Sequence, residues 1–258
     1  MNTKIIAIII LVLAIGGSSA YFLTKNDSVD IGTSSSESIY QNEKIGLVIN
    51  TINPPKGVVH VEESYKLAST SGIGRTNLYI HWDQLEPEKE SFDWRVTDAL
   101  MKLNEKYNLK TTLFFSVINA DRLGPFPPWM GNQLIGKSLE LDTIRVLDEI
   151  LSRYENIDYV IFAGDLDYHL QRATAVIPIY EEFFNNISSE IKSNHPNVKI
   201  GNSISLENII NKDLIPNGNF ELTPQLEMGD FIALSYKPTD VLGDINRTPQ
   251  EAIDEFKK

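Results

Sequence analysis

The sequence predicts an α/β protein with a parallel β-sheet, and an incomplete (β/α)8 TIM barrel is the arrangement that fits it best. From residue 44 onward, short apolar runs alternate with longer amphipathic segments, as in parallel strands joined by helical crossovers. A doubly wound sheet usually has a glycine-rich turn after its first strand, but NTINPP (50–55) contains no glycine. The 258 residues suffice for one barrel, which typically needs about 250.

The first 25 residues have the pattern of a signal anchor or a signal peptide. Residues 5–23 are 19 positions without a charge, enough for a helix to cross a hydrocarbon core of about 30 Å. A signal peptide would be cut after the small residues Ser18 and Ala20, whereas Tyr21, Phe22 and Leu23 continue the apolar run and favour an anchor in the membrane. Both alternatives export the rest of the chain, to the outer side of the cell membrane or into the medium.

The remaining chain divides into a linker and a barrel. Residues 26–43 are polar and serine-rich, which is typical of a linker, and we expect the partial barrel to occupy 44–258. Apolar runs predict strands, and apolar positions spaced three or four apart predict helices. In chain order the pairs of strand and helix are 44–50 with 60–72, 75–82 with 95–108, 109–118 with 139–154, 157–164 with a helix ending near His195, 198–205 with 206–214, and 230–236 with 248–258.

A closed barrel has eight pairs of strand and helix, and this sequence contains six. We therefore expect the sequence to be truncated after its sixth unit, or the last two strands to come from elsewhere. A second copy that completes an oligomeric barrel is the weaker form of the latter idea, because open strand edges favour aggregation over symmetric pairing.

Composition excludes several functions. The chain has 23 basic and 35 acidic residues, a formal charge of -12, so it has no electrostatic attraction for nucleic acid. It contains no cysteine, which excludes disulfides, thiolate metal sites and cysteine nucleophiles. We expect no cofactor and no metal.

Active sites of (β/α)8 barrels lie at the carboxyl ends of the strands. Aromatic rings beside carboxylates and amides suit a sugar, which offers apolar C–H faces and hydroxyls. Binding residues also concentrate in loops such as GPFPPWMG (124–131). The predicted ligand is an oligosaccharide or polysaccharide, and the candidate binding residues are Asn50, His81, Trp82, Asn119, Trp129, Asp167 and Tyr236. Other polar residues at strand ends are Asp83, Glu86, Ser116, His169, Ser203, Ser205 and Glu207.

Three segments resemble a known family. LYIHWDQLEPEKESFDW (78–94), YVIFAGDLDYHL (159–170) and GDFIALSYKP (229–238) are similar to the second, fourth and sixth strands of clan A glycoside hydrolases, in particular galactanase-like members. The resemblance covers nearly everything from residue 44. It implies a (β/α)8 barrel that hydrolyses O-glycosidic bonds of polysaccharide by a retaining mechanism, with the acid/base on the fourth strand and the nucleophile on the seventh.

The chain departs from that family at the acid/base. Gly164 and Asp165 stand where the family has Asn-Glu, and no seventh strand is found that would supply a nucleophile. The resemblance makes Asp165 the candidate acid/base. The departures leave a second hypothesis open, that of a non-catalytic surface protein that binds carbohydrate.

Two weaker alternatives use the same strand. Asp165-x-Asp167-x-His169 resembles the Asp-x-Asp-x-Glu run of chitinase barrels, with His169 in place of the acid. The same three residues would share one strand face and so suggest a metal site, although such a trio is more often a hydrogen-bonded set.

Several other residues are expected to be structural. Phe92 and Trp94 should pack against a helix, and Arg75 should pair with a buried acid. His60 and His195 are expected at the surface, whereas alternation alone leaves it open whether His81 faces the barrel mouth or packs under a helix.

Overall fold

The computed structural model describes residues 41–49, 58–172, 174–206 and 228–236, together with 248, 250, 251 and 254. The predicted helix over 5–23, most of the linker and Asn50 lie outside this range, as do most residues of the helices expected over 206–214 and 248–258. None of the helices in the described part of the chain is long and apolar enough to cross a membrane.

The centre of the fold is a curled sheet. Its strands are β1 (Asn42–Leu47), β2 (Ile73–Tyr79), β3 (Lys110–Asn119), β5 (Ile157–Gly164), β6 (Lys199–Ser205) and β7 (Phe231–Ser235), in that spatial order. All neighbouring strands along this path are parallel, and the short β4 (Arg122–Leu123) pairs antiparallel with the end of β3. Because each crossover moves one strand further along the sheet, the result is a half-barrel. The predicted α/β class and incomplete barrel are confirmed.

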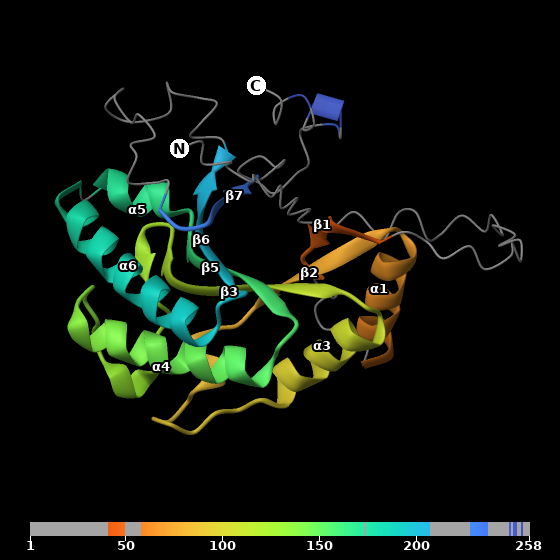
Figure 1. Cartoon of the computed structure of the whole chain (residues 1–258), viewed down its shortest axis with the longest axis horizontal. Helices are drawn as coiled ribbons and strands as arrows, with labels where there is room; N and C mark the ends of the chain where they lie inside the picture. Colours follow the sequence, from red (N-terminus) through yellow and green to blue (C-terminus); the bar gives the residue numbers. More distant parts are fainter. Residues whose placement is uncertain are drawn as a thin grey trace, which may run out of the picture.

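Helices cover the outer face of this sheet (Figure 1). The longer ones are α1 (Val58–Thr70), α3 (Arg95–Lys106), α4 (Lys137–Arg153) and α6 (Ile177–Asn194), and each connects two successive strands. The short α2 (Trp82–Leu85), α5 (Leu166–Arg172), η1 (Pro128–Met130) and η2 (Thr174–Val176) were not predicted. Periodicity needs a window of about 11 residues, so elements this short give no such signal.

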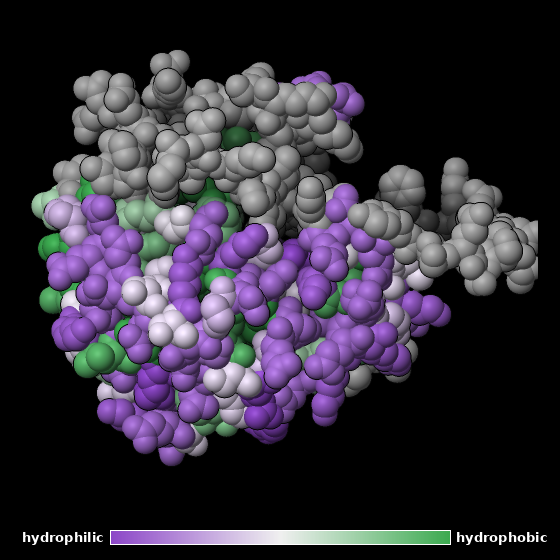
Figure 2. All heavy atoms as spheres, in the orientation of Figure 1, coloured by the Kyte–Doolittle hydropathy of each residue, from purple (hydrophilic) through white to green (hydrophobic). Residues whose placement is uncertain are grey.

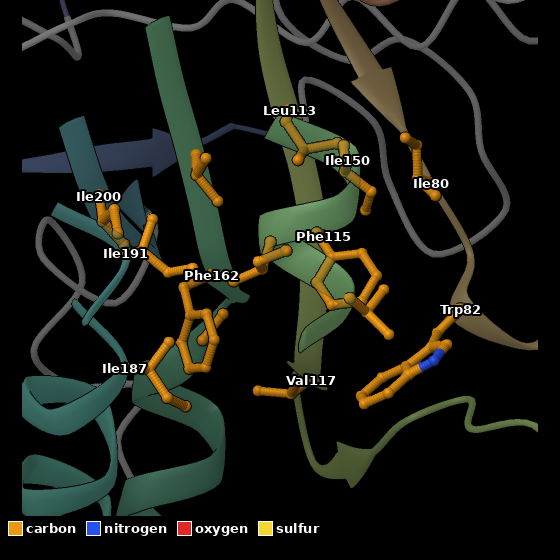
Figure 3. Packing of buried hydrophobic residues seen from close by; sticks show 14 of the residues in the cluster. Ile80, Trp82, Leu113, Phe115, Val117, Ile150, Phe162, Ile187, Ile191 and Ile200 are labelled. Atoms are coloured by element: carbon orange, nitrogen blue, oxygen red, sulfur yellow. The ribbon is translucent and has the colours of Figure 1, made fainter. Parts of the chain in front are cut away.

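The main hydrophobic core lies between the sheet and its helices (Figure 3). Alternate residues of β3, namely Leu113, Phe115 and Val117, point to this side because successive strand residues face opposite ways. Phe162 of β5 and Ile187 of α6 belong to the same cluster. Figure 2 shows the outside of this layer, which is covered mainly by hydrophilic residues with apolar ones scattered among them.

The predicted packing of Phe92 and Trp94 is confirmed, and Arg75 pairs with an acid as predicted, although that acid, Asp158, is half-buried rather than buried. Phe92 and Trp94 stack on each other with their ring centres 5.0 Å apart and pack against the main core. Arg75, of which 4% of the side chain is exposed, forms an ion pair with Asp158 in which Nη2 lies 2.9 Å from Oδ2. Arg75 also donates to Thr112 Oγ1 at 3.1 Å. The ion pair joins the starts of β2 and β5 and therefore closes the inner face at the amino end of the strands.

Candidate functional site

A cavity of about 780 Å³ opens at the carboxyl ends of the strands. Its walls come from β2, β3, β5, β6 and β7 and from the turn that contains β4. This is where barrel enzymes place their active sites. The lining residues are Asn77, Tyr79, His81, Phe114, Asn119, Ala120, Asp121, Arg122, Leu123, Gly124, Pro125, Ile161, Gly164, Asp165, Ser203, Ala233, Leu234, Ser235 and Tyr236.

Four of the predicted site residues meet in this cavity. They are His81, Asn119, Asp165 and Tyr236, which come from the ends of four different strands or the loops that follow. His81 is exposed and faces the cavity, so the question that alternation left open is answered. The likeness to barrel active sites is thus one of position.

An aromatic pair forms one wall. Tyr79 of β2 and Phe114 of β3 are opposite each other in the strand register, and their rings stack with centres 4.3 Å apart and planes 24° apart. Burial, followed by the nearby charge of Asp165, raises the pKa of Tyr79 to about 12, so its hydroxyl stays protonated at neutral pH. The wall therefore offers flat apolar surface together with a neutral hydroxyl.

Asp165 follows β5 directly and is half-buried. Its φ of 49° lies in the left-handed region, which is costly for a residue with a side chain and is concentrated at functional sites. Ala120, after β3, has a φ of 51°, and its N–H donates to the carbonyl of Gly164 at 2.8 Å. Two neighbouring strands thus turn sharply beside each other at the cavity, and this turn directs the Asp165 carboxylate into it.

The glycine before Asp165 lies in close contact with an aromatic ring. A Cβ atom at Gly164 would lie 2.6 Å from Cζ of Phe114, well inside van der Waals contact. The Phe114 ring is held there by its stacking on Tyr79. An aromatic ring therefore occupies the space that a larger side chain at position 164 would need.

Asn119 has an internal partner. Its Nδ2 donates to the carbonyl of Gly124 at 2.6 Å, and the N–H of Gly124 donates to Val117 at 3.0 Å. These bonds hold the turn that carries Asp121 and Arg122. Asn119 lines the cavity, but half of its amide is used to shape the wall.

The structure places the two candidate tryptophans elsewhere. Trp82 is 3% exposed, and its ring centre lies 5.4 Å from that of Phe115 in the outer core (Figure 3). Its Nε1 donates to Glu86 Oε2 at 2.8 Å, and Nε1 of Trp129 donates to the Glu86 carbonyl at 3.0 Å. Neither ring is among the described residues that line the cavity. Both tryptophans bind Glu86 instead, Trp82 at its buried carboxylate and Trp129 at its backbone carbonyl. The carboxylate also pairs with Arg145 at 2.8 Å.

The expectation that Asp165, Asp167 and His169 share one strand face is wrong, because α5 begins at Leu166. Asp167 is 1% exposed and accepts a hydrogen bond from the N–H of Ser205 at 3.0 Å, so it ties α5 to β6. Burial lowers the pKa of His169 and is opposed by a hydrogen bond to the backbone of Asp121. In the described part of the chain, no group of three or more His, Cys, Asp or Glu side chains is placed so that it could hold a metal ion.

Sequence reasoning missed several residues that face the cavity. Asn77, Tyr79, Phe114 and Ser235 lie within strands rather than after them, whereas Asp121 lies in the turn after β3. Once Arg75 is assigned to the inner face, alternation along β2 places Asn77 and Tyr79 on that face too. The alternation of β2 therefore contained the signal for Asn77 and Tyr79, but candidates were predicted only at the strand ends.

Comparison with known proteins supports the fold. No protein-family model matches the sequence, and no curated protein is similar to it in sequence. Among solved structures, the β-glycosidase BGL167 is 12% identical with a TM-score of 0.51, over 76% of this chain and 62% of that one. A family 39 glycoside hydrolase from Bacteroides cellulosilyticus WH2 is 14% identical (TM-score 0.47, 63% of this chain, 31% of that one). The exo-β-1,4-mannosidase Op5Man5 from Opitutaceae bacterium strain TAV5 is 14% identical (TM-score 0.48, 59% and 29%).

The class that the fold defines is thus a partial (β/α)8 barrel. At these identities the likeness shows the fold alone, and the resemblance to clan A glycoside hydrolases is confirmed at that level. The chain spans less than two thirds of the length of each of these three proteins.

Proposed function

We propose that the cavity binds an oligosaccharide or polysaccharide and that the protein hydrolyses its O-glycosidic bonds with Asp165 as the acid/base. The observation that carries this proposal is the position of Asp165, on a strained turn at the carboxyl end of β5, within a cavity that also has an aromatic wall and several neutral polar groups. A site that binds and cleaves a sugar needs a carboxyl group, an apolar surface and neutral polar groups together.

The binding part of the proposal follows from the lining. The Tyr79–Phe114 wall offers apolar surface to the C–H face of a pyranose ring, which stacks on such rings. Amide and hydroxyl groups from Asn77, Ser203 and Tyr236 lie on the same cavity and suit sugar hydroxyls. Because most of these groups are neutral, the lining fits a neutral sugar.

The catalytic part requires a second carboxyl group. One carboxyl protonates the leaving oxygen, while the other attacks the anomeric carbon in a retaining enzyme or activates water in an inverting one. Within the described residues, Asp121 is the other carboxylate on the cavity. The nucleophile of the proposed retaining mechanism is unassigned, and Asp121 is the first residue to compare with Asp165 by mutation.

Non-catalytic carbohydrate binding is the second candidate function. The Phe114 ring fills the space next to Gly164, and the Asp165 carboxylate accepts a hydrogen bond from the Ser235 hydroxyl. Both features favour a carboxylate that is held in place for binding. This candidate predicts glycan binding without turnover.

The experiment uses the whole chain against β-1,4-linked galacto-, manno-, gluco- and xylo-oligosaccharides. Binding is measured by calorimetry, and turnover by the release of reducing ends. Binding with turnover supports hydrolysis, and binding without turnover supports the second candidate. If no sugar binds, both candidates are rejected.

We also propose that the protein acts outside the cell. The proposal is supported by the uncharged run over 5–23 and the serine-rich stretch that follows it. Fractionation of the native host is the test. Protein in the membrane or in the medium agrees with export, whereas protein only in the cytosol contradicts it.

A further inference from the structure

We infer that Asn77 selects the innermost sugar of the bound ligand, by binding two neighbouring hydroxyls of that ring with its side-chain amide. The inference rests on the proposed carbohydrate-binding function and extends it, since it assigns a subsite and the hydroxyl pattern that the subsite takes. It starts from a buried polar group on the cavity wall.

The amide of Asn77 is buried and unsatisfied. The residue is 5% exposed, and neither Oδ1 nor Nδ2 has a hydrogen-bond partner among the described residues. A buried polar group left unpaired destabilises the folded state, so such groups are rare in folded proteins. Thr76, the preceding residue, does find a partner, because its hydroxyl donates to Asn104 Oδ1 at 2.8 Å. Asn77 instead lines the cavity.

The position of Asn77 within β2 sets its depth. Alternation places Arg75, Asn77 and Tyr79 on the inner face in that order. Arg75 is engaged below by its ion pair with Asp158, while Tyr79 above it is 39% exposed at the rim. The amide therefore lies between the Arg75–Asp158 ion pair below and the Tyr79 ring above. A ring that stacks at the rim would direct its inner edge toward Asn77.

The chemistry of the amide defines the ligand group. A carboxamide presents an acceptor and a donor side by side, and so do two hydroxyls on adjacent carbons. One hydroxyl donates to Oδ1 while the other accepts from Nδ2, so both unsatisfied atoms are paired. A carboxylate or a cation would satisfy only one of them. The fitting ligand is therefore a neutral sugar with a free vicinal diol.

The first test is Asn77→Leu in the full chain. Leucine has nearly the same volume but no polar atoms, so it removes an unpaired amide without removing a hydrogen bond of the free protein. We expect sugar affinity to fall about tenfold or more, since two hydrogen bonds to the ligand are lost, while the thermal midpoint does not fall.

Thr112→Val is the matched control, because Thr112 is the register partner of Asn77 and its hydroxyl accepts from Arg75. It should lower stability and leave sugar affinity unchanged. Equal affinities of wild type and Asn77→Leu would overturn the inference and leave the proposed function standing.

The second test uses the unmutated protein and therefore does not depend on how the variant folds. Monodeoxy analogues of the tightest-binding sugar are compared by calorimetry. We expect the loss of either of two adjacent hydroxyls to weaken binding about tenfold, and the same analogues to lose no further affinity against Asn77→Leu. Deoxy analogues that all bind like the parent sugar overturn the inference. If no sugar of the panel binds the wild type, the proposed function fails and the inference is overturned with it.

Discussion

The hydroxyl of Ser235, at the end of β7, donates a hydrogen bond to the carboxylate of Asp165, the first residue after β5, although 70 positions separate the two in the sequence. Strand β6 lies between them in the sheet, so this bond crosses the mouth of the half-barrel. It fixes the direction of the carboxylate that the cavity presents to a ligand.

Asp165→Asn tests the proposed acid/base. The amide keeps the shape of the side chain but cannot donate a proton to a leaving oxygen, so hydrolysis should fall by about 10² to 10⁴ while sugar affinity changes little. Ser235→Ala should reduce turnover less, because the carboxylate loses only its positioning bond. Reducing-end release measures both. Full turnover by Asp165→Asn would contradict the assignment.

Gly164→Ala tests the contact with Phe114. The new Cβ would meet the ring at 2.6 Å, and overpacking of this kind costs about 1–3 kcal/mol of unfolding free energy. Denaturant unfolding measures the loss, and Phe114→Leu in the same chain should restore part of it. Gly136→Ala is the control, because its Cβ would have no atom within 4 Å. Equal losses at the two glycines would refute the explanation.

Trp82→Phe tests the assignment of Trp82 to the outer core. Phenylalanine cannot donate to Glu86, so a buried hydrogen bond to a charged group is lost and stability should fall by about 1.5–3 kcal/mol. Sugar affinity should stay at the wild-type value, because the ring does not reach the described cavity. A large loss of affinity at normal stability would instead restore Trp82 as a binding residue.

Arg75→Met tests the ion pair at the amino end of the sheet. Removing the guanidinium leaves Asp158 and Thr112 without their shared partner, and breaking a buried pair typically costs about 3–5 kcal/mol. Asp158 is 35% exposed, so we expect the low end of that range. Arg95→Met, which removes an arginine with an 88% exposed side chain from its pair with Asp93, should leave the thermal midpoint unchanged.

Asp98 should make stability sensitive to acid. Hydrogen bonds from Arg153 and Tyr154 lower its pKa from the ordinary 3.8 to about 2. A lowered folded-state pKa means that the stabilisation is fully present above about pH 4 and is lost as the pH falls toward about 2. Asp98→Asn should therefore be less stable at neutral pH and show a weaker decline over that window. A decline of Asp98→Asn as steep as that of the wild type would contradict this role of Asp98.

The strand and helix pattern was predictable because it depends on local chemistry. The expected strand over 157–164 is observed with the same bounds as β5, and the helix expected over 95–108 is α3, Arg95–Lys106. Apolar periodicity decides which face of an element is buried, and this information is contained in each segment. The carboxyl ends of the strands were likewise the correct place to look for a cavity.

Only the tertiary structure decided which residues meet in that cavity. A strand end predicts position along the sheet but not direction, and so His81 faces the cavity while Trp82 beside it packs into the outer core. The sequence alone also placed Gly164 before Asp165, but the contact that leaves no room for a side chain there is with a ring 50 residues earlier, brought next to Gly164 by the pairing of β3 with β5. Such relationships depend on the distance between residues remote in the chain, which local periodicity does not contain.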